Sequence, residues 1–262
     1  MSTSESDEDW GARFREVYAA PASAVLSRIF AEVLGDDYPA ALDTYSWISL
    51  PELREISVAL GVGPEHLLAD VGCGRGGPGL WVATATGCRL VGFDIADTAV
   101  DEATTRALDL GLADRARFRT GSWEDIAQPD GSLDAVMGVD SFLFAPDKPA
   151  AFAELARVVR PGGRLALTSW DYFAQPAGRP PQVPDHRPLA AAAGFTVRSY
   201  EETHDWRERC VRAAELMMAT IDDYAAEAGV TPDGLRPVLE EMRATMDVMT
   251  RRFLMIAERD SG

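Results

Sequence analysis

The residues best suited to bind a ligand form a glycine-rich loop. Leu67-Leu-Ala-Asp-Val-Gly-Cys-Gly-Arg-Gly-Gly77 reads as a strand, then a loop with glycines at 72, 74, 76 and 77, then a helix. Glycine lets the backbone turn tightly, and a ligand can approach the main chain without meeting a Cβ atom. The glycines fit Gly-x-Gly-x-x-Gly, typical of dinucleotide binding, and equally Gly-x-Gly-x-Gly preceded by an acid, Asp70. Asp94 ends the next predicted strand, where a carboxylate can accept both hydroxyls of a ribose. The loop therefore predicts a nucleotide-like ligand.

The candidates for acid–base chemistry are three histidines. His66 begins the first predicted strand, away from the ligand-binding end. His204 directly follows the sixth predicted strand, and His186 ends a proline-rich loop, so both are expected at the ligand-binding end. An imidazole near its ordinary pKa of about 6.5 accepts a proton at neutral pH. We predict His204 as the first candidate for a general base and His186 as the second, with an ordinary loop histidine as the alternative for each.

Other catalytic patterns are absent from the sequence. It has no His-x-x-x-His pair, no tight carboxylate group and no Gly-x-Ser-x-Gly elbow, so we predict neither a metal site nor a serine hydrolase. Three cysteines at unrelated spacings form neither a disulfide framework nor a metal knuckle. Cys73 is interpreted as a small loop residue, because no His or Lys stands near it to lower the pKa of its thiol.

Strands and helices alternate after residue 62, which predicts an α/β fold. The predicted strands are 66–71, 89–94, 116–120, 133–139, 164–170, 195–202 and 253–257. The predicted intervening helices are 80–86, 98–110, 123–127, 149–159 and 187–193. This alternation is typical of a doubly wound, mostly parallel sheet with helices on both faces and a ligand at the carboxyl ends of its strands.

Two helical regions flank this alternation. Residues 1–9 are polar and acidic and predict a disordered tail, and 10–61 predict a helical cover in which Tyr38, Tyr45 and Trp47 close one side of the site. The core is assigned to 62–205, a two-helix insertion to 206–249 and the final strand to 250–262. Both ends of the insertion fall at the ligand-binding edge, so we expect it to lie over the site as a substrate lid. Its methionines, with Met217, Met218, Met242, Met246 and Met249 among the eight in the chain, suit an irregular apolar ligand, helix packing or a dimer contact.

The order of these motifs resembles that of the class I S-adenosylmethionine-dependent methyltransferases. The resemblance runs from about residue 67 to 195. The matching segments are Asp70-Val-Gly-Cys-Gly-Arg-Gly76, Val91-Gly-Phe-Asp94, Gly121-Ser-Trp-Glu-Asp125, Leu133-Asp-Ala-Val136, Arg160-Pro-Gly-Gly163 and Ala193-Gly-Phe195. The resemblance implies a seven-stranded sheet with an antiparallel last strand, and S-adenosylmethionine as cofactor.

The resemblance also implies roles for single residues. Asp70 would attract the methionine ammonium, and Gly72, Cys73 and Gly74 would offer their backbone. Asp94 would bind the ribose. Around the adenine, Ile95 would pack on the ring, Ser122 would hydrogen-bond it and Trp123 would cover it. Asp140, which follows the fourth strand at the same edge, completes the predicted cofactor-binding set.

The composition restricts the partners. Asp and Glu number 42 against 25 Lys and Arg, a net charge of −17, which disfavours nucleic acid and anionic membranes. We expect a cytoplasmic monomer or homodimer with a small-molecule acceptor.

These observations predict methyl transfer to a small, apolar metabolite of bacterial specialised metabolism. The alternative keeps S-adenosylmethionine as a non-consumed cofactor for a cyclisation or elimination, because a fold does not fix its chemistry. A nicotinamide-dependent oxidoreductase would leave the Arg160-Pro-Gly-Gly turn unexplained, and a non-catalytic subunit would not need an intact glycine loop.

Overall fold

The computed structural model describes residues 10–42 and 46–261. A seven-stranded sheet forms the centre, in the order β3-β2-β1-β4-β5-β7-β6. Only β7 runs antiparallel to its neighbours. The strands are β1 (Leu67–Val71), β2 (Arg89–Asp94), β3 (Ala116–Thr120), β4 (Leu133–Val139), β5 (Val159–Tyr172), β6 (Phe195–Glu202) and β7 (Met249–Arg259). This architecture confirms the predicted fold class.

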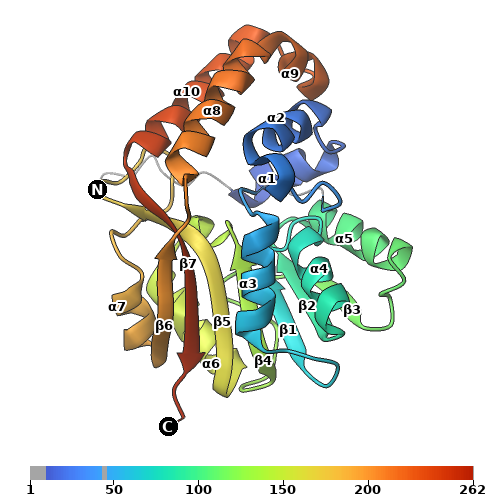
Figure 1. Ribbon diagram of the computed structural model, residues 1–262, viewed down its shortest axis with the longest axis vertical. Helices are drawn as coiled ribbons and strands as arrows, with labels where there is room; N and C mark the ends of the chain where they lie inside the picture. The colour runs from blue at the N-terminus through green and yellow to red at the C-terminus, as the bar shows by residue number, and fades with distance from the viewer. Residues whose placement is uncertain (1–9, 43–45, 262) are drawn as a thin grey trace, which may run out of the picture.

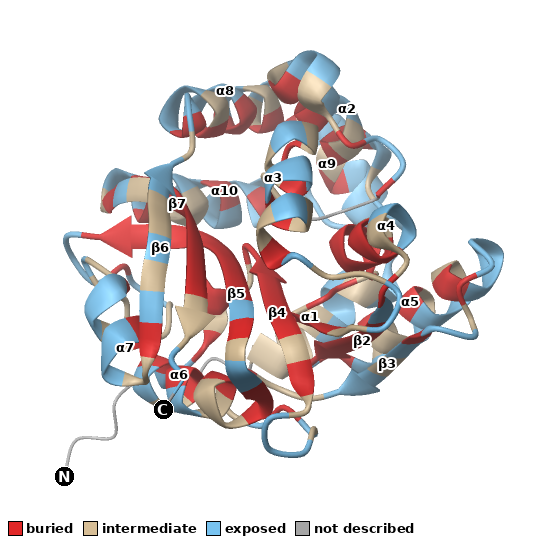
Figure 2. Cartoon of the chain, turned by 60° about the horizontal axis from the view of Figure 1, so that its bottom comes forward, coloured by how far each residue is buried: buried red, intermediate tan, exposed pale blue. Residues whose placement is uncertain are grey.

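Helices cover both faces of the sheet. One face packs against α3 (Leu50–Leu60), α4 (Gly77–Thr86) and α5 (Asp97–Asp109), through residues such as Leu53, Leu80 and Ala107. The other packs against α6 (Lys148–Val158) and α7 (Arg187–Ala192), through Phe152 and Ala190. The central strands are buried along most of their length (Figure 2). Because β1 lies between β2 and β4, the strand order reverses between β1 and β4, and a crevice opens at their carboxyl ends.

Two helical groups lie over this edge of the sheet (Figure 1). The cover comprises α1 (Trp10–Ala19), α2 (Ala24–Leu34), the short 3₁₀ turn η1 (Gly35–Asp37) and the segment leading to α3. The lid comprises α8 (Trp206–Ala219), α9 (Ile221–Ala228) and α10 (Pro232–Asp247). Cover and lid share a hydrophobic cluster that contains Phe30, Met217 and Leu235. The tail 1–9 and Tyr45, for which we made predictions, lie outside the described residues.

Local signals in the sequence place the ends of several elements. Ser49 and Glu52 form a capping box at the start of α3, and Gly61 ends that helix with φ 60°. Arg160-Pro-Gly-Gly lies inside β5, which makes this strand longer than predicted, and β7 also extends beyond 253–257 at both ends.

Two predicted helices differ from the structure. Residues 123–127 form no helix, because Ser122 and Asp125 bond each other's backbone in a tight turn and the amide of Ile126 donates to Glu154 Oε1. The lid has three helices within 206–249 where we predicted two, because Thr220 leaves the helical conformation (φ −112°, ψ 24°) between α8 and α9.

No single described helix is long and apolar enough to cross a membrane, and only the bent pair Trp10–Ala19 with Ala24–Asp37 passes that test of length and composition together.

Candidate functional site

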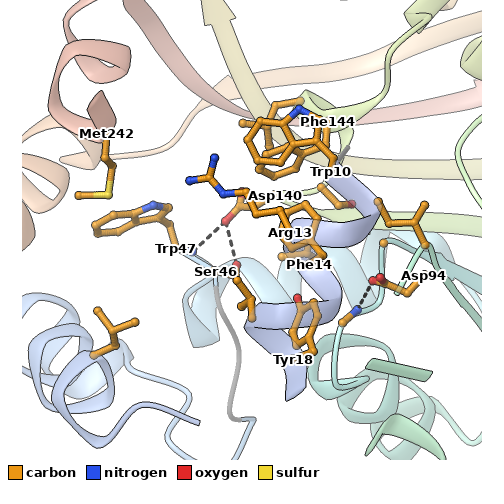
Figure 3. Close-up of a pocket in the computed structure, with 18 of the residues that line it drawn as sticks. Trp10, Arg13, Phe14, Tyr18, Ser46, Trp47, Asp94, Asp140, Phe144 and Met242 are labelled. Carbon is orange, nitrogen blue, oxygen red and sulfur yellow. Dashed lines mark hydrogen bonds between the residues drawn. The ribbon is translucent and has the colours of Figure 1, made fainter. Parts of the chain in front are cut away.

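One large cavity lies where the sheet edge, the cover and the lid meet. Its volume is about 1520 Å³, whereas a pocket for one drug-sized ligand spans about 300–1,000 Å³. The glycine loop and the ends of β2 and β4 line one part, and aromatic and methionine side chains of the cover and lid line the rest (Figure 3). The cavity therefore has room for two ligands side by side.

The glycine loop presents backbone to the cavity. Gly72 and Gly74 have φ of 69° and 51°, in the left-handed region that favours glycine. A Cβ at Gly72 would lie 2.3 Å from Ser141 Cβ, and one at Gly74 would lie 2.7 Å from the Tyr18 hydroxyl. Glycine is therefore needed at both positions so that Ser141 and Tyr18 of α1 can pack against the loop, and both glycines still line the cavity.

Asp94 is held in place by backbone amides. Its Oδ2 accepts from Gly74 N at 2.8 Å, and its Oδ1 accepts from Ala96 N at 3.0 Å. Burial raises the pKa of this carboxyl, and the amides lower it in part. Asp94 lines the cavity at the end of β2, so its free lone pairs can accept hydroxyls of a ligand.

Asp70 and Cys73 have different surroundings from each other. Asp70 is buried and is not part of the cavity wall; its Oδ2 accepts from Gly79 N at 3.0 Å in the first turn of α4. Burial raises the pKa of Asp70 to about 7. Its position fits a role in joining β1 to α4 more directly than contact with a ligand. Cys73 lines the cavity, and burial with the charges of Asp94 and Asp70 raises the pKa of its thiol, which stays neutral.

The residues predicted to contact adenine come together on the cavity wall. Ile95, Ser122 and Trp123 all line it beside Asp94. The Trp123 ring packs edge-on against Phe142 at a centroid distance of 4.9 Å. A Cβ at Gly138 of β4 would lie 2.3 Å from this ring, so glycine is needed there for the indole to lie across the strand.

Asp140 lines the cavity, but its carboxylate is already saturated. It accepts five hydrogen bonds, from Ser46 Oγ, Trp47 N and Thr168 Oγ1 at 2.8 Å each and from Arg252 Nε and Nη2 at 3.2 Å each. The bonds from Ser46 and Trp47 attach the cover to the sheet edge (Figure 3). Asp140 therefore anchors the cover beside the predicted cofactor-binding residues.

A buried ion network continues from Asp140. Arg252 of β7 is fully buried and also contacts Glu52 of α3, while its Nη1 donates to Thr203 Oγ1 at 2.7 Å. Neither Arg252 nor Glu52 was predicted from the sequence as part of the site. The available signal was an arginine directly before the apolar run of the last strand.

The two predicted bases lie outside the cavity. The side chain of His204 is 91% exposed, with Asp205 as its ion-pair partner at 3.2 Å. His186 is fully buried, and its Nδ1 lies 2.9 Å from Asp171 Oδ1, which also accepts from the Tyr200 hydroxyl at 2.7 Å. Burial lowers the pKa of His186. For His204 the reason is topological: β6 is the edge strand beyond β7, so the turn after it lies away from the crevice between β1 and β4. His186 instead directly precedes α7, which packs on the same face of the sheet as α6. Neither position favours the predicted role.

The rest of the cavity is lined mainly by apolar side chains. The lid contributes Met217, Met242, Met246 and Met249, whereas Met218 does not line the cavity. The cover contributes Trp10, Phe14, Phe30 and Trp47, among others, and Figure 3 shows Met242 beside Trp47 and on the opposite side from Trp10. We call these cavity-lining residues of the lid and the cover the acceptor wall. Among the described residues, no group of three or more His, Cys, Asp or Glu side chains can hold a metal ion.

The fold and this site are those of an α/β protein that binds a nucleoside-bearing ligand at its sheet edge, next to a mainly apolar part of the same cavity. Residues 68–163 match the methyltransferase domain family. Methyltransferase GfsG of Streptomyces halstedii is 31% identical over 241 residues, which cover 88% of this chain and 84% of that protein. The 27-O-demethylrifamycin SV methyltransferase of Amycolatopsis mediterranei is 31% identical over 189 residues, 71% of this chain and 61% of that protein. The crystal structure of the [4+2]-cyclase SpnF superimposes with a TM-score of 0.72 at 20% identity, covering 100% of this chain and 99% of that one.

The chain belongs to the class I S-adenosylmethionine-dependent methyltransferases. Its cofactor is S-adenosylmethionine, as predicted. The residues of this chain fit that cofactor, because glycine backbone, a fixed carboxylate and an indole line one continuous part of the cavity.

Proposed function

We propose that this protein methylates an apolar metabolite of bacterial specialised metabolism. The observation that carries the proposal is the single cavity of about 1520 Å³, in which the glycine loop and the acceptor wall share one space. GfsG and the rifamycin methyltransferase support a natural product as the acceptor, and the second of these is named for a reaction at an oxygen. The volume fits an acceptor much larger than a simple alcohol or amine.

The cofactor would be held by the residues at the sheet edge. Asp94 would accept the ribose hydroxyls, and the backbone from Gly72 to Gly74 would contact the amino acid portion. Ile95 and Trp123 would enclose the adenine, with Ser122 as a hydrogen-bond partner. These assignments rest on their shared position in the cavity wall.

Methyl transfer from a sulfonium is an in-line displacement that depends mainly on alignment and on exclusion of water. The acceptor wall supplies both through rigid aromatic rings such as Trp47 and Phe14 and adaptable side chains such as Met242. No histidine is among the described residues that line the cavity. We therefore propose that the chain contributes orientation more than proton transfer.

The closeness in fold to a [4+2]-cyclase keeps a second candidate open, a cyclisation that does not consume the cofactor. The two functions differ in stoichiometry. A methyltransferase forms one S-adenosylhomocysteine for each product, whereas a cyclase forms product without it. A panel of macrocyclic and linear polyketide alcohols, followed by mass spectrometry of product and S-adenosylhomocysteine, separates them.

Calorimetry with S-adenosylhomocysteine tests the cofactor assignment. The change Asp94→Asn should weaken binding by roughly 1.5–3 kcal/mol, the usual value of hydrogen bonds to a charged group. Asp97→Asn is a matched control, because Asp97 lies three residues further along, is exposed and is absent from the cavity wall. Equal affinities for the Asp94 variant and the wild type would contradict the ribose assignment.

A further inference from the structure

The lid carries an unusual pattern of charge on its cavity side. The described lid residues that line the cavity are mostly apolar, among them Met217, Leu235, Val238, Met242 and Met246, and the set also contains Glu227 and Glu241. The two charged members of this set are both glutamates. On the lid side, the acceptor wall is therefore mainly apolar, and its charged side chains are all negative.

The two glutamates differ in their partners. Glu227 Oε2 accepts from the amide of Val25 at 3.1 Å and so joins α9 to α2. The half-buried carboxylate of Glu241 has no hydrogen-bond or ion-pair partner in the described part of the chain. Its neighbours on the cavity side of α10 are Val238, Met242 and Thr245. A carboxylate beside apolar groups loses hydration, and a cationic ligand group would offset that cost.

The basic residues of the cavity come from other elements. Arg13 belongs to α1, Arg75 to the glycine loop and Arg179 to the loop after β5. The guanidinium groups of Arg13 and Arg179 each lie 4.9 Å from the centroid of the Trp10 ring. In Figure 3, Trp10 and Met242 lie on opposite sides of the pocket. Two of the three arginines thus lie at Trp10, where α1 also contributes the exposed Glu16, whereas the half-buried Glu241 lies on the lid next to Met242 in the chain.

We propose that Glu241 recognises a basic nitrogen of the acceptor, so that the substrate is an apolar molecule with a protonated amine. This inference rests on the proposed function, since it assigns the acceptor to the lid side of the cavity. The apolar body of the acceptor packs on Val238 and Met242 while its ammonium donates to the Glu241 carboxylate. The net charge of −17 adds a long-range attraction for a cation. Glu241 acts here as a specificity residue and takes no part in the bond changes.

A matched set of small probes tests the inference without the natural acceptor. The probes are 1-adamantylamine, 1-adamantanol and adamantane-1-carboxylate, which share one apolar body and differ in charge. Each is titrated by calorimetry into the full chain saturated with S-adenosylhomocysteine. The wild type should bind the amine about tenfold more tightly than the alcohol, because a charge-assisted hydrogen bond is added. The carboxylate should bind most weakly.

Two variants of α10 complete the test. Glu241→Gln should bring the amine and the alcohol to within about threefold of each other and leave the alcohol unchanged. Glu240→Gln removes the same charge from an exposed neighbour outside the cavity wall and should keep the tenfold preference. An amine preference that survives Glu241→Gln, or that Glu240→Gln abolishes equally, overturns the proposal. So does a wild type that binds none of the three probes.

The titration with S-adenosylhomocysteine comes first and separates the two proposals. Failure to bind it contradicts the proposed function, whatever the probes do. Normal binding of S-adenosylhomocysteine without an amine preference contradicts only the role of Glu241.

Discussion

The substitution Arg252→Met tests the buried ion network that attaches the cover and α3 to the sheet. Arg252 is fully buried between Asp140 and Glu52 and donates to both. Methionine retains much of the apolar stem but removes the guanidinium. Two carboxylates then remain in the interior without their cation. Loss of one partner from a buried ion pair costs about 3–5 kcal/mol, and we expect a loss of that size in the free energy of unfolding at pH 8.

The loss should depend on pH. Burial raises the pKa of Glu52, but the charge and hydrogen bonds of Arg252 outweigh burial and hold it below its ordinary value of 4.5. In the wild type, this stabilisation is present above pH 4.5 and is lost as the pH falls through the lowered pKa of the folded state. In the variant, Arg252 no longer lowers the pKa of Glu52, and only the hydrogen bonds from Thr203 and Ser49 oppose the effect of burial. The folded pKa of Glu52 is then higher than in the wild type, so the variant lacks a stabilisation that the wild type gains as the pH rises. The difference between the two proteins should therefore be larger at pH 8 than at pH 5.5.

Urea unfolding followed by circular dichroism at both pH values measures this difference. Arg198→Met provides a control, because Arg198 is 57% exposed and pairs with Glu258 at 3.3 Å on the surface. That control should lose less than about 1 kcal/mol. If Arg252→Met loses no more than Arg198→Met at either pH, the network does not stabilise the fold and the reasoning is refuted.

The fold could be predicted because its signals are local. The glycine loop, the carboxylate at the end of β2 and the Arg160-Pro-Gly-Gly segment each depend on residues adjacent in sequence. The capping box at Ser49 is likewise complete within four residues. Parallel strands then leave few topologies, so the doubly wound, mostly parallel sheet followed from the alternation of elements, whereas the antiparallel last strand was implied by the family resemblance.

The site could be predicted only in part, because its remaining contacts join distant segments. Asp140 seemed available to the cofactor, but Arg252, which lies 112 positions further along the chain, occupies it. His204 follows the same physical rule. Its distance to the crevice depends on which strand lies at the sheet edge, and the local sequence of β6 does not encode that β7 separates it from β5.

Two further predictions concern the cover and the interior. Gly77→Ala should lower the free energy of unfolding by about 1–3 kcal/mol, since its Cβ would lie 2.3 Å from the carbonyl oxygen of Leu42 in the cover. Thermal unfolding measures this loss, and Gly63→Ala is the control, because the nearest atom to its Cβ would be 3.9 Å away. The second concerns His186. Burial lowers the pKa of its imidazole, although the carboxylate of Asp171 acts in the opposite direction. Below pH about 6.5 the imidazole of His186 binds a proton in the unfolded chain but not in the folded protein. The free energy of unfolding therefore rises with pH until the unfolded imidazole is neutral. Asp70, with its pKa raised to about 7, contributes the opposite slope, and only a comparison with His186→Phe isolates the histidine. Urea unfolding between pH 5.5 and 7.5 measures this effect, and His186→Phe should gain less stability with rising pH than the wild type. Parallel pH profiles of the two proteins would mean that His186 keeps its ordinary protonation in the folded protein.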